Sequence, residues 1–128
     1  MGYRTPISRI AVVDEDASVR ASLSGLLRAL GYDARTFASA DEFLRALPRF
    51  APRCLISAAQ MPGMQGEQLQ TEILASGHRF PVIFHTDSPT DAMRQRLLAA
   101  GAFALLATPV EADAIAACLA AALATVPG

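Results

Sequence analysis

Two acidic residues, two threonines and one alanine stand at or just beyond the ends of separate apolar runs. They are Asp14, Glu15, Ala58, Thr86 and Thr108. Mg²⁺ prefers oxygen ligands that include carboxylates, so Asp14 and Glu15 are candidates to hold it weakly. The alternative is that both acids simply favour the start of the following helix. Ala58 cannot act as a nucleophile and Thr108 carries no charge, so the pattern predicts no catalytic group and no firmly bound metal.

Apolar runs alternate with stretches of helical periodicity along the whole chain. The expected strands are residues 7–13, 34–37, 54–58, 81–85 and 103–106. The expected helices are residues 17–30, 39–47, 67–76, 88–100 and 111–124. Ser39 and Glu42 have the spacing of a capping box, and Ser88-Pro89 has the pattern of an N-cap followed by proline in the first turn.

This alternation predicts an α/β fold, in which a parallel sheet is covered by helices on both faces. Sites in such open sheets form at the carboxyl ends of the strands, where all five positions named above are expected. The 128 residues are the length of one domain, and residues 125–128 could begin a linker.

Several separated motifs fall in an order that resembles one known family. They are residues 12–16, the stretch 54–66 with Met61-Pro62-Gly63, residues 36–44, residues 100–102 and the step Thr108-Pro109. Together they resemble the receiver domain of bacterial two-component response regulators, most of all regulators in which a DNA-binding helix-turn-helix follows the receiver. The resemblance implies a flavodoxin-like (βα)5 fold with strand order 2-1-3-4-5.

The resemblance also assigns roles to positions, and several residues depart from the family pattern. It implies that Ala58 stands where the family has its phospho-acceptor aspartate and Thr108 where it has a lysine; the chain contains no lysine at all. Thr86 matches the family's hydroxyl residue, whereas Asp87 replaces a small residue. Leu105 stands where the family has a switching aromatic side chain. We therefore interpret the chain as a degenerate receiver.

Three functions follow from this interpretation. The first is a phosphorylation-independent interaction module in signal transduction or transcriptional regulation. The second is a sensor that binds a small ligand or ion in the pocket beside Ala58. The third is conventional phosphorylation at a displaced residue such as Asp87. The sequence shows no glycine-rich phosphate loop, nucleophile elbow or metal cluster, so an enzyme is not expected.

The last expected helix has almost no polar face, because it is built mainly of alanine. An all-round apolar helix is usually covered, which predicts a contact surface that contains Ile115 and Leu119 and has Arg94 and Arg96 at its rim. The partners expected are a histidine kinase, another regulator, a transcription component or a second copy of the chain. The alternative is that alanine merely occupies an ordinary helix surface.

Charge and hydropathy limit the other partners. The net charge is −1 and the eleven cations are arginines scattered along the sequence, so nucleic-acid binding is not expected. The longest apolar stretch carries Glu111 and Asp113 and is neither a membrane span nor a leader, which predicts a cytoplasmic protein without membrane contact.

His78 and His85 lack metal-ligand spacing and are interpreted as structural or surface residues.

Overall fold

The computed structural model describes residues 7–126 and contains five strands and five helices in strict alternation. The strands are β1 (Arg9–Val13), β2 (Asp33–Phe37), β3 (Cys54–Ala58), β4 (Val82–Thr86) and β5 (Ala104–Ala107). The helices are α1 (Ala17–Ala29), α2 (Ala40–Ala46), α3 (Gly66–Ala75), α4 (Asp91–Ala99) and α5 (Ala112–Leu123). All strand pairs are parallel, in the order β2-β1-β3-β4-β5, which confirms the predicted flavodoxin-like fold.

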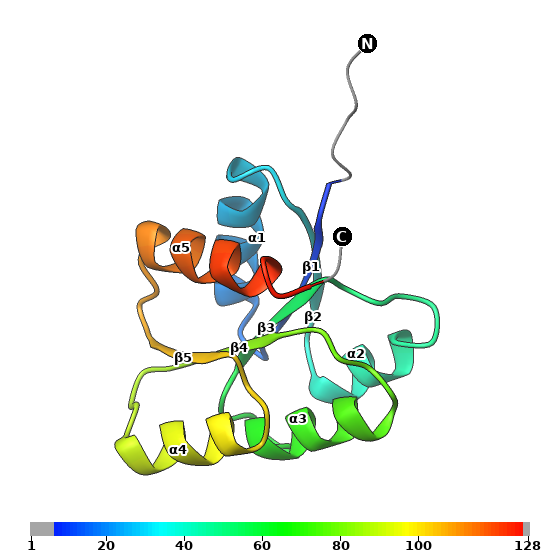
Figure 1. Ribbon diagram of the computed structural model, residues 1–128. Helices are drawn as coiled ribbons and strands as arrows, with labels where there is room; N and C mark the ends of the chain where they lie inside the picture. The colour runs from blue at the N-terminus through cyan, green and yellow to red at the C-terminus, as the bar shows by residue number, and fades with distance from the viewer. Residues whose placement is uncertain (1–6, 127–128) are drawn as a thin grey trace.

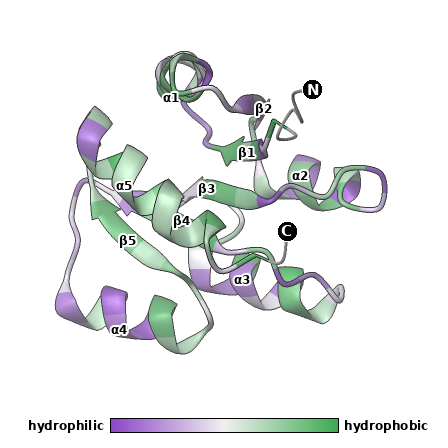
Figure 2. Ribbon diagram, turned by 45° about the horizontal axis from the view of Figure 1, so that its top comes forward, coloured by the Kyte–Doolittle hydropathy of each residue, from purple (hydrophilic) through white to green (hydrophobic). Residues whose placement is uncertain are grey.

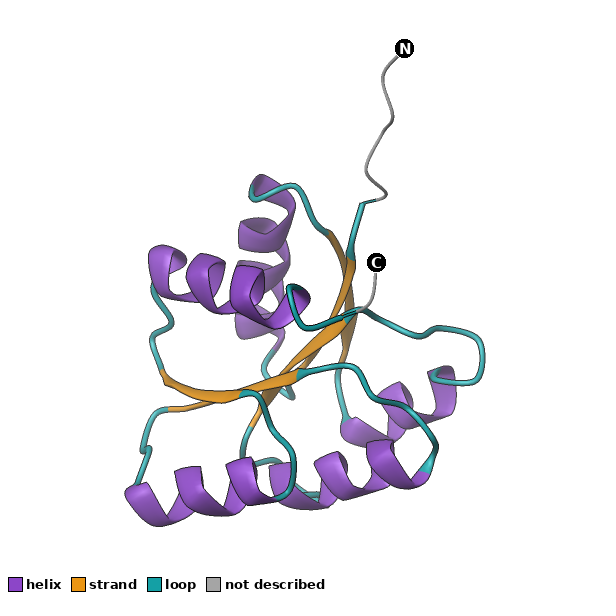
Figure 3. Cartoon of the chain, viewed as in Figure 1, coloured by secondary structure: helices purple, strands orange, loops and turns teal. Residues whose placement is uncertain are grey.

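The sheet forms the middle layer of the molecule, with α1 and α5 on one face and α2, α3 and α4 on the other (Figure 1, Figure 3). Alternation along β1 divides its side chains between the two faces. Ile10 and Val12 pack in the core under α1 and α5, whereas Ala11 and Val13 pack in the core under the other three helices. All four side chains are fully buried, as expected for a parallel sheet covered on both faces.

Local signals begin and end the helices as the sequence predicts, with one exception. The backbone N–H of Glu42 donates to Ser39 Oγ over 3.1 Å, which confirms the cap of α2. The predicted cap of α4 at Ser88 is wrong, because Thr90 caps this helix by accepting from the Met93 N–H at 3.1 Å. Ser88 is already engaged, since its hydroxyl donates to the Asp87 carboxylate.

Helix α5 covers the sheet with its large side chains and exposes its small ones. Ile115 and Leu119 are fully buried in the core shared with α1, so the prediction that they form a contact surface is wrong. They are buried because this face of the parallel sheet needs an apolar cover. The exposed side of α5 carries Asp113 in the first turn and otherwise alanines such as Ala117 and Ala121, and the helix is coloured hydrophobic along most of its length (Figure 2).

Burial and helix length bear on cysteine chemistry and on membrane insertion. Cys54 is buried and Cys118 half-buried, both are free thiols, and burial raises the pKa of Cys54 to about 12. Among residues 7–126, no helix is both long enough and apolar enough to cross a bilayer. The start of the linker predicted at residues 125–128 lies partly outside the described residues, which end at Val126.

We predict that Leu119→Ala lowers the free energy of unfolding by about 2–5 kcal/mol, because it leaves a cavity beneath α5. Urea denaturation followed by circular dichroism measures the change. The matched control is Ala121→Gln on the exposed side of the same helix, which should shift stability by no more than about 0.5 kcal/mol. Equal effects of the two substitutions would contradict the burial of Leu119.

Candidate functional site

The structure brings all five chemistry-bearing positions to one end of the sheet. Asp14, Glu15, Ala58, Thr86 and Thr108 line a single cavity of about 270 Å³ at the carboxyl ends of the strands. Other residues complete its wall: Asp16, Val19, Gln60, His85 and Asp87. The placement arises because β1 lies between β2 and β3, so that the chain turns to opposite sides of the sheet after β1 and β3.

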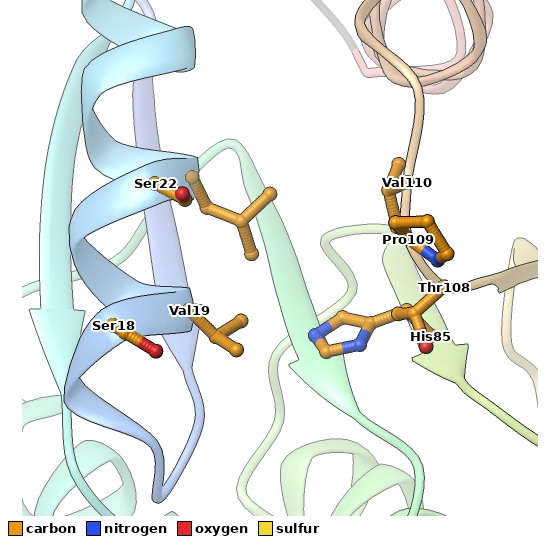
Figure 4. Close-up of a pocket in the computed structure, with 8 residues that line it drawn as sticks. Ser18, Val19, Ser22, His85, Thr108, Pro109 and Val110 are labelled. Atoms are coloured by element: carbon orange, nitrogen blue, oxygen red, sulfur yellow. The ribbon is translucent and has the colours of Figure 1, made fainter.

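The closest approach between titratable side chains in this cavity joins Asp14 to His85. His85 Nε2 lies 3.2 Å from Asp14 Oδ2, and both side chains are buried. The imidazole lies between Val19 of α1 and the segment that carries Thr108 and Pro109, beside a second cavity of about 280 Å³ (Figure 4). The contact therefore links strands β1 and β4 beneath α1.

Ala58 is what allows this contact to form. In the sheet Ala58 pairs with His85, and the neighbouring strand pairs Val13 with Ser57, so Asp14 comes next beside Ala58. Since strands are about 4.8 Å apart, Asp14 and His85 start about 10 Å apart with β3 between them. The residue between them, Ala58, ends at a methyl group and so leaves space for their side chains to approach each other. A longer side chain at position 58 would compete for the same space.

The oxygen atoms of Asp14 are almost fully occupied by protein groups. Oδ1 accepts the backbone N–H of Asp16 over 2.9 Å, and the main-chain carbonyl accepts Arg20 Nη1 over 2.7 Å. Glu15 is exposed and Ala58 offers no side-chain oxygen. Within residues 7–126, no three acidic, histidine or cysteine side chains are placed to share a metal ion. The donor set therefore does not fit firm Mg²⁺ coordination.

The remaining positions at the strand ends are held by local hydrogen bonds. Thr86 is buried, and its Oγ1 accepts the Ser88 N–H over 3.3 Å. Asp87 is exposed and its carboxylate accepts the Ser88 hydroxyl over 3.2 Å. Thr108 N donates to the Thr86 carbonyl over 2.9 Å, and the Thr108-Pro109 peptide is cis. These contacts fix the loops but bring no cation to the cavity.

Leu105 and the two arginines expected at a rim lie away from this cavity. The Leu105 side chain is buried in the core on the side of α4, and its carbonyl accepts Arg94 Nη1 over 2.8 Å. Arg96 is exposed and forms an ion pair of 3.4 Å with Glu67. Arg94 thus joins α4 to β5, and Arg96 joins α4 to α3.

Burial lowers the pKa of His85 below its ordinary value of 6.5, and the nearby Asp14 carboxylate opposes this shift. The histidine is therefore mainly neutral at pH 7. Its buried Nε2 lies close to Asp14 Oδ2, but the geometry does not make a hydrogen bond between them. Sequence interpretation missed His85 as part of the site. The register of the strands would have identified His85, because it places this residue in the same row as Asp14 and Ala58.

Comparisons with known proteins agree with this geometry. Residues 10–120 match the family described as the response regulator receiver domain. The transcriptional regulatory protein FixJ of Bradyrhizobium diazoefficiens is 33% identical over 109 residues, which cover 85% of this chain and 53% of that protein. The transcriptional regulatory protein TdiR of Thauera aromatica is 36% identical over 102 residues, covering 80% and 45%.

A solved structure gives the same result in three dimensions. Full-length FixJ from B. japonicum superposes with a TM-score of 0.87 at 32% identity, covering 94% of this chain and 59% of that one. The chain belongs to the family of response regulator receiver domains, which act in two-component signalling. It spans about half the length of the curated relatives it matches.

We predict that stability falls as the pH is lowered from about 6.5, through a window that ends at the lowered pKa of folded His85. In that window the unfolded chain binds a proton at position 85 that the folded chain does not, so protonation favours unfolding. The slope from this one group is at most about 1.4 kcal/mol per pH unit.

Urea denaturation at several pH values measures this dependence. His85→Gln keeps a polar side chain beside Asp14 but does not titrate, so it should flatten the curve relative to the native chain. The control is His78→Gln, which removes the other histidine and should leave the dependence in place. An unchanged slope in His85→Gln would refute the assignment.

Proposed function

We propose that this receiver domain works without phosphorylation and signals by protein–protein interaction. The observation that carries the proposal is the residue row Asp14, Ala58 and His85. In our proposal Ala58 takes the position of the phospho-acceptor aspartate. The Asp14–His85 contact of 3.2 Å crosses the space above Ala58. The side chain that would receive a phosphoryl group is replaced by a methyl group.

The charges around the cavity support the same proposal. An acyl phosphate needs positive charge nearby, from a metal ion or a fixed cation. Here the cavity wall carries the carboxylates of Asp14, Glu15, Asp16 and Asp87. In our proposal Thr108 takes the position of the family's lysine. His85 is mainly neutral and already faces Asp14. A phosphate group at this place would meet negative charge.

The Arg94–Leu105 hydrogen bond indicates how the domain would keep one conformation. In our proposal this bond holds β5 against α4, and buried Leu105 lacks the bulk of the aromatic switch. The partner would be a histidine kinase or another regulator of a two-component system. The matched relatives are about twice as long as this chain and bear the names of transcriptional regulators. In our proposal a DNA-binding output domain would be a separate part of a longer protein that contains this receiver.

Two other functions have less support. The cavity of about 270 Å³ beside Ala58 could hold a small cationic ligand, because four carboxylates line it. Phosphorylation at Asp87 is disfavoured, since within residues 7–126 no arginine or histidine pairs with its carboxylate to stabilise the added charge.

We predict that the chain gains no phosphoryl group from acetyl phosphate and Mg²⁺, measured by intact-protein mass. The double variant Ala58→Asp, Thr108→Lys should gain one, because it restores a nucleophile and a cation at the two altered positions. Ala58→Asp alone is the control and should be modified much less. A phosphorylated native chain would refute the proposal.

We predict that exposed alanines of α5, rather than Ile115 and Leu119, provide a self-association surface. Light scattering after size exclusion should show a dimer at high micromolar concentration. Ala117→Arg, Ala121→Arg places two charges on this surface and should give a monomer with the native circular dichroism spectrum. The control Ala21→Arg, Ala29→Arg adds the same charge to exposed α1 and should remain a dimer. A native chain that stays monomeric would refute this surface.

A further inference from the structure

The arginines are scattered in the sequence but four of them gather around one aromatic ring. Arg9 and Arg35 lie over the Phe50 ring, with guanidinium carbons 5.2 and 5.0 Å from its centroid. Arg45 and Arg49 stand at the end of α2 and in the turn that follows, and they line a cavity with Arg35 and Phe50. Arginines that are scattered along the sequence therefore form a local cluster in the fold.

The fold explains why these four side chains converge. Arg9 opens β1 and Arg35 lies in the neighbouring strand β2, while α2 returns along the face of the sheet. Arg49 N and Phe50 N both donate to the Ala46 carbonyl, over 3.0 and 2.9 Å. This turn buries the Phe50 ring beneath the strands and leaves Arg49 at the surface beside Arg45.

Few carboxylates balance this positive charge. Arg9 pairs with Asp33 over 3.4 Å, but within residues 7–126 no carboxylate forms an ion pair with Arg35, Arg45 or Arg49. Glu42, one turn before Ala46, faces the Ser39 hydroxyl instead. Three guanidinium groups thus share one cavity wall without an ion pair to a carboxylate. Their mutual repulsion is relieved when an anion binds among them.

We propose that this cavity, lined by Arg35, Arg45, Ala46, Pro48, Arg49 and Phe50, binds a small soluble ligand that carries two linked phosphate groups. Its volume of about 520 Å³ is within the range of roughly 300–1,000 Å³ for small-molecule sites. A guanidinium donates two parallel N–H groups to phosphate oxygens, and two phosphates match three such groups better than one. Stacking on Phe50 orients the Arg35 guanidinium in advance.

This inference goes beyond the proposed function and does not depend on it, because the cavity lies at the edge formed by β2 and α2, away from Ala58. The test is a titration of the ¹⁵N-labelled chain with sodium pyrophosphate at constant ionic strength. Saturable amide shifts are expected at residues 35 and 45–50, whereas the amides around Ala58 should not shift. Sodium chloride at the same ionic strength should not reproduce the shifts.

The variant Arg45→Gln, Arg49→Gln should weaken pyrophosphate binding by about tenfold or more, since two of three forked donors are lost. The control Arg28→Gln, Arg79→Gln removes the same charge from exposed positions elsewhere and should change affinity less than about twofold. Equal weakening by both variants, or shifts that do not saturate, would overturn the site. Binding of a short DNA duplex through the same four arginines, if tighter than the binding of pyrophosphate, would also overturn the proposed site in favour of a nucleic-acid surface.

Discussion

The parallel pairing of β1, β3 and β4 in one register is the constraint on which both the core and the site depend. It places Val12, Ile56 and Ile83 in one row beneath α1 and α5, and it leads the same three strands to Asp14, Ala58 and His85 at their carboxyl ends. A slip of one residue in β3 would move Ile56 out of this core and separate Asp14 from His85. The hydrophobic pattern that stabilises the sheet therefore also determines which polar groups meet.

Most of the fold could be predicted from the sequence, because its signals are local. Alternating apolar runs and helical periodicity predict five strands, five helices and the parallel sheet. Single residues also set helix ends in the structure: the Ser39 hydroxyl caps the start of α2, and Gly101, with a φ of 111°, follows the end of α4. The errors came where two local signals compete. Ser88 and Thr90 can both cap a helix, and the choice depends on contacts of Ser88 with Asp87 that the sequence does not display.

The candidate site was harder to predict, because its decisive features are contacts between distant segments. The strand-end positions of Asp14, Ala58 and Thr86 followed from alternation, but the burial of His85 against Asp14 required the register of three strands. Helix α5 shows the same limit. Its composition suggests an apolar surface on every side. In the fold the large side chains of Ile115 and Leu119 face the sheet, and the exposed side carries mostly alanines together with Asp113.

A net charge of −1 conceals two separate local charges. Arg9 opens β1 beside the arginine-lined cavity, and Asp14 follows its last residue in the acidic cavity. Five residues of extended strand separate them by about 16 Å. This exceeds the screening length of about 8 Å at physiological ionic strength, so neither end neutralises the other. Each end of the sheet can therefore attract a partner of opposite charge, and composition alone could not exclude an anionic ligand.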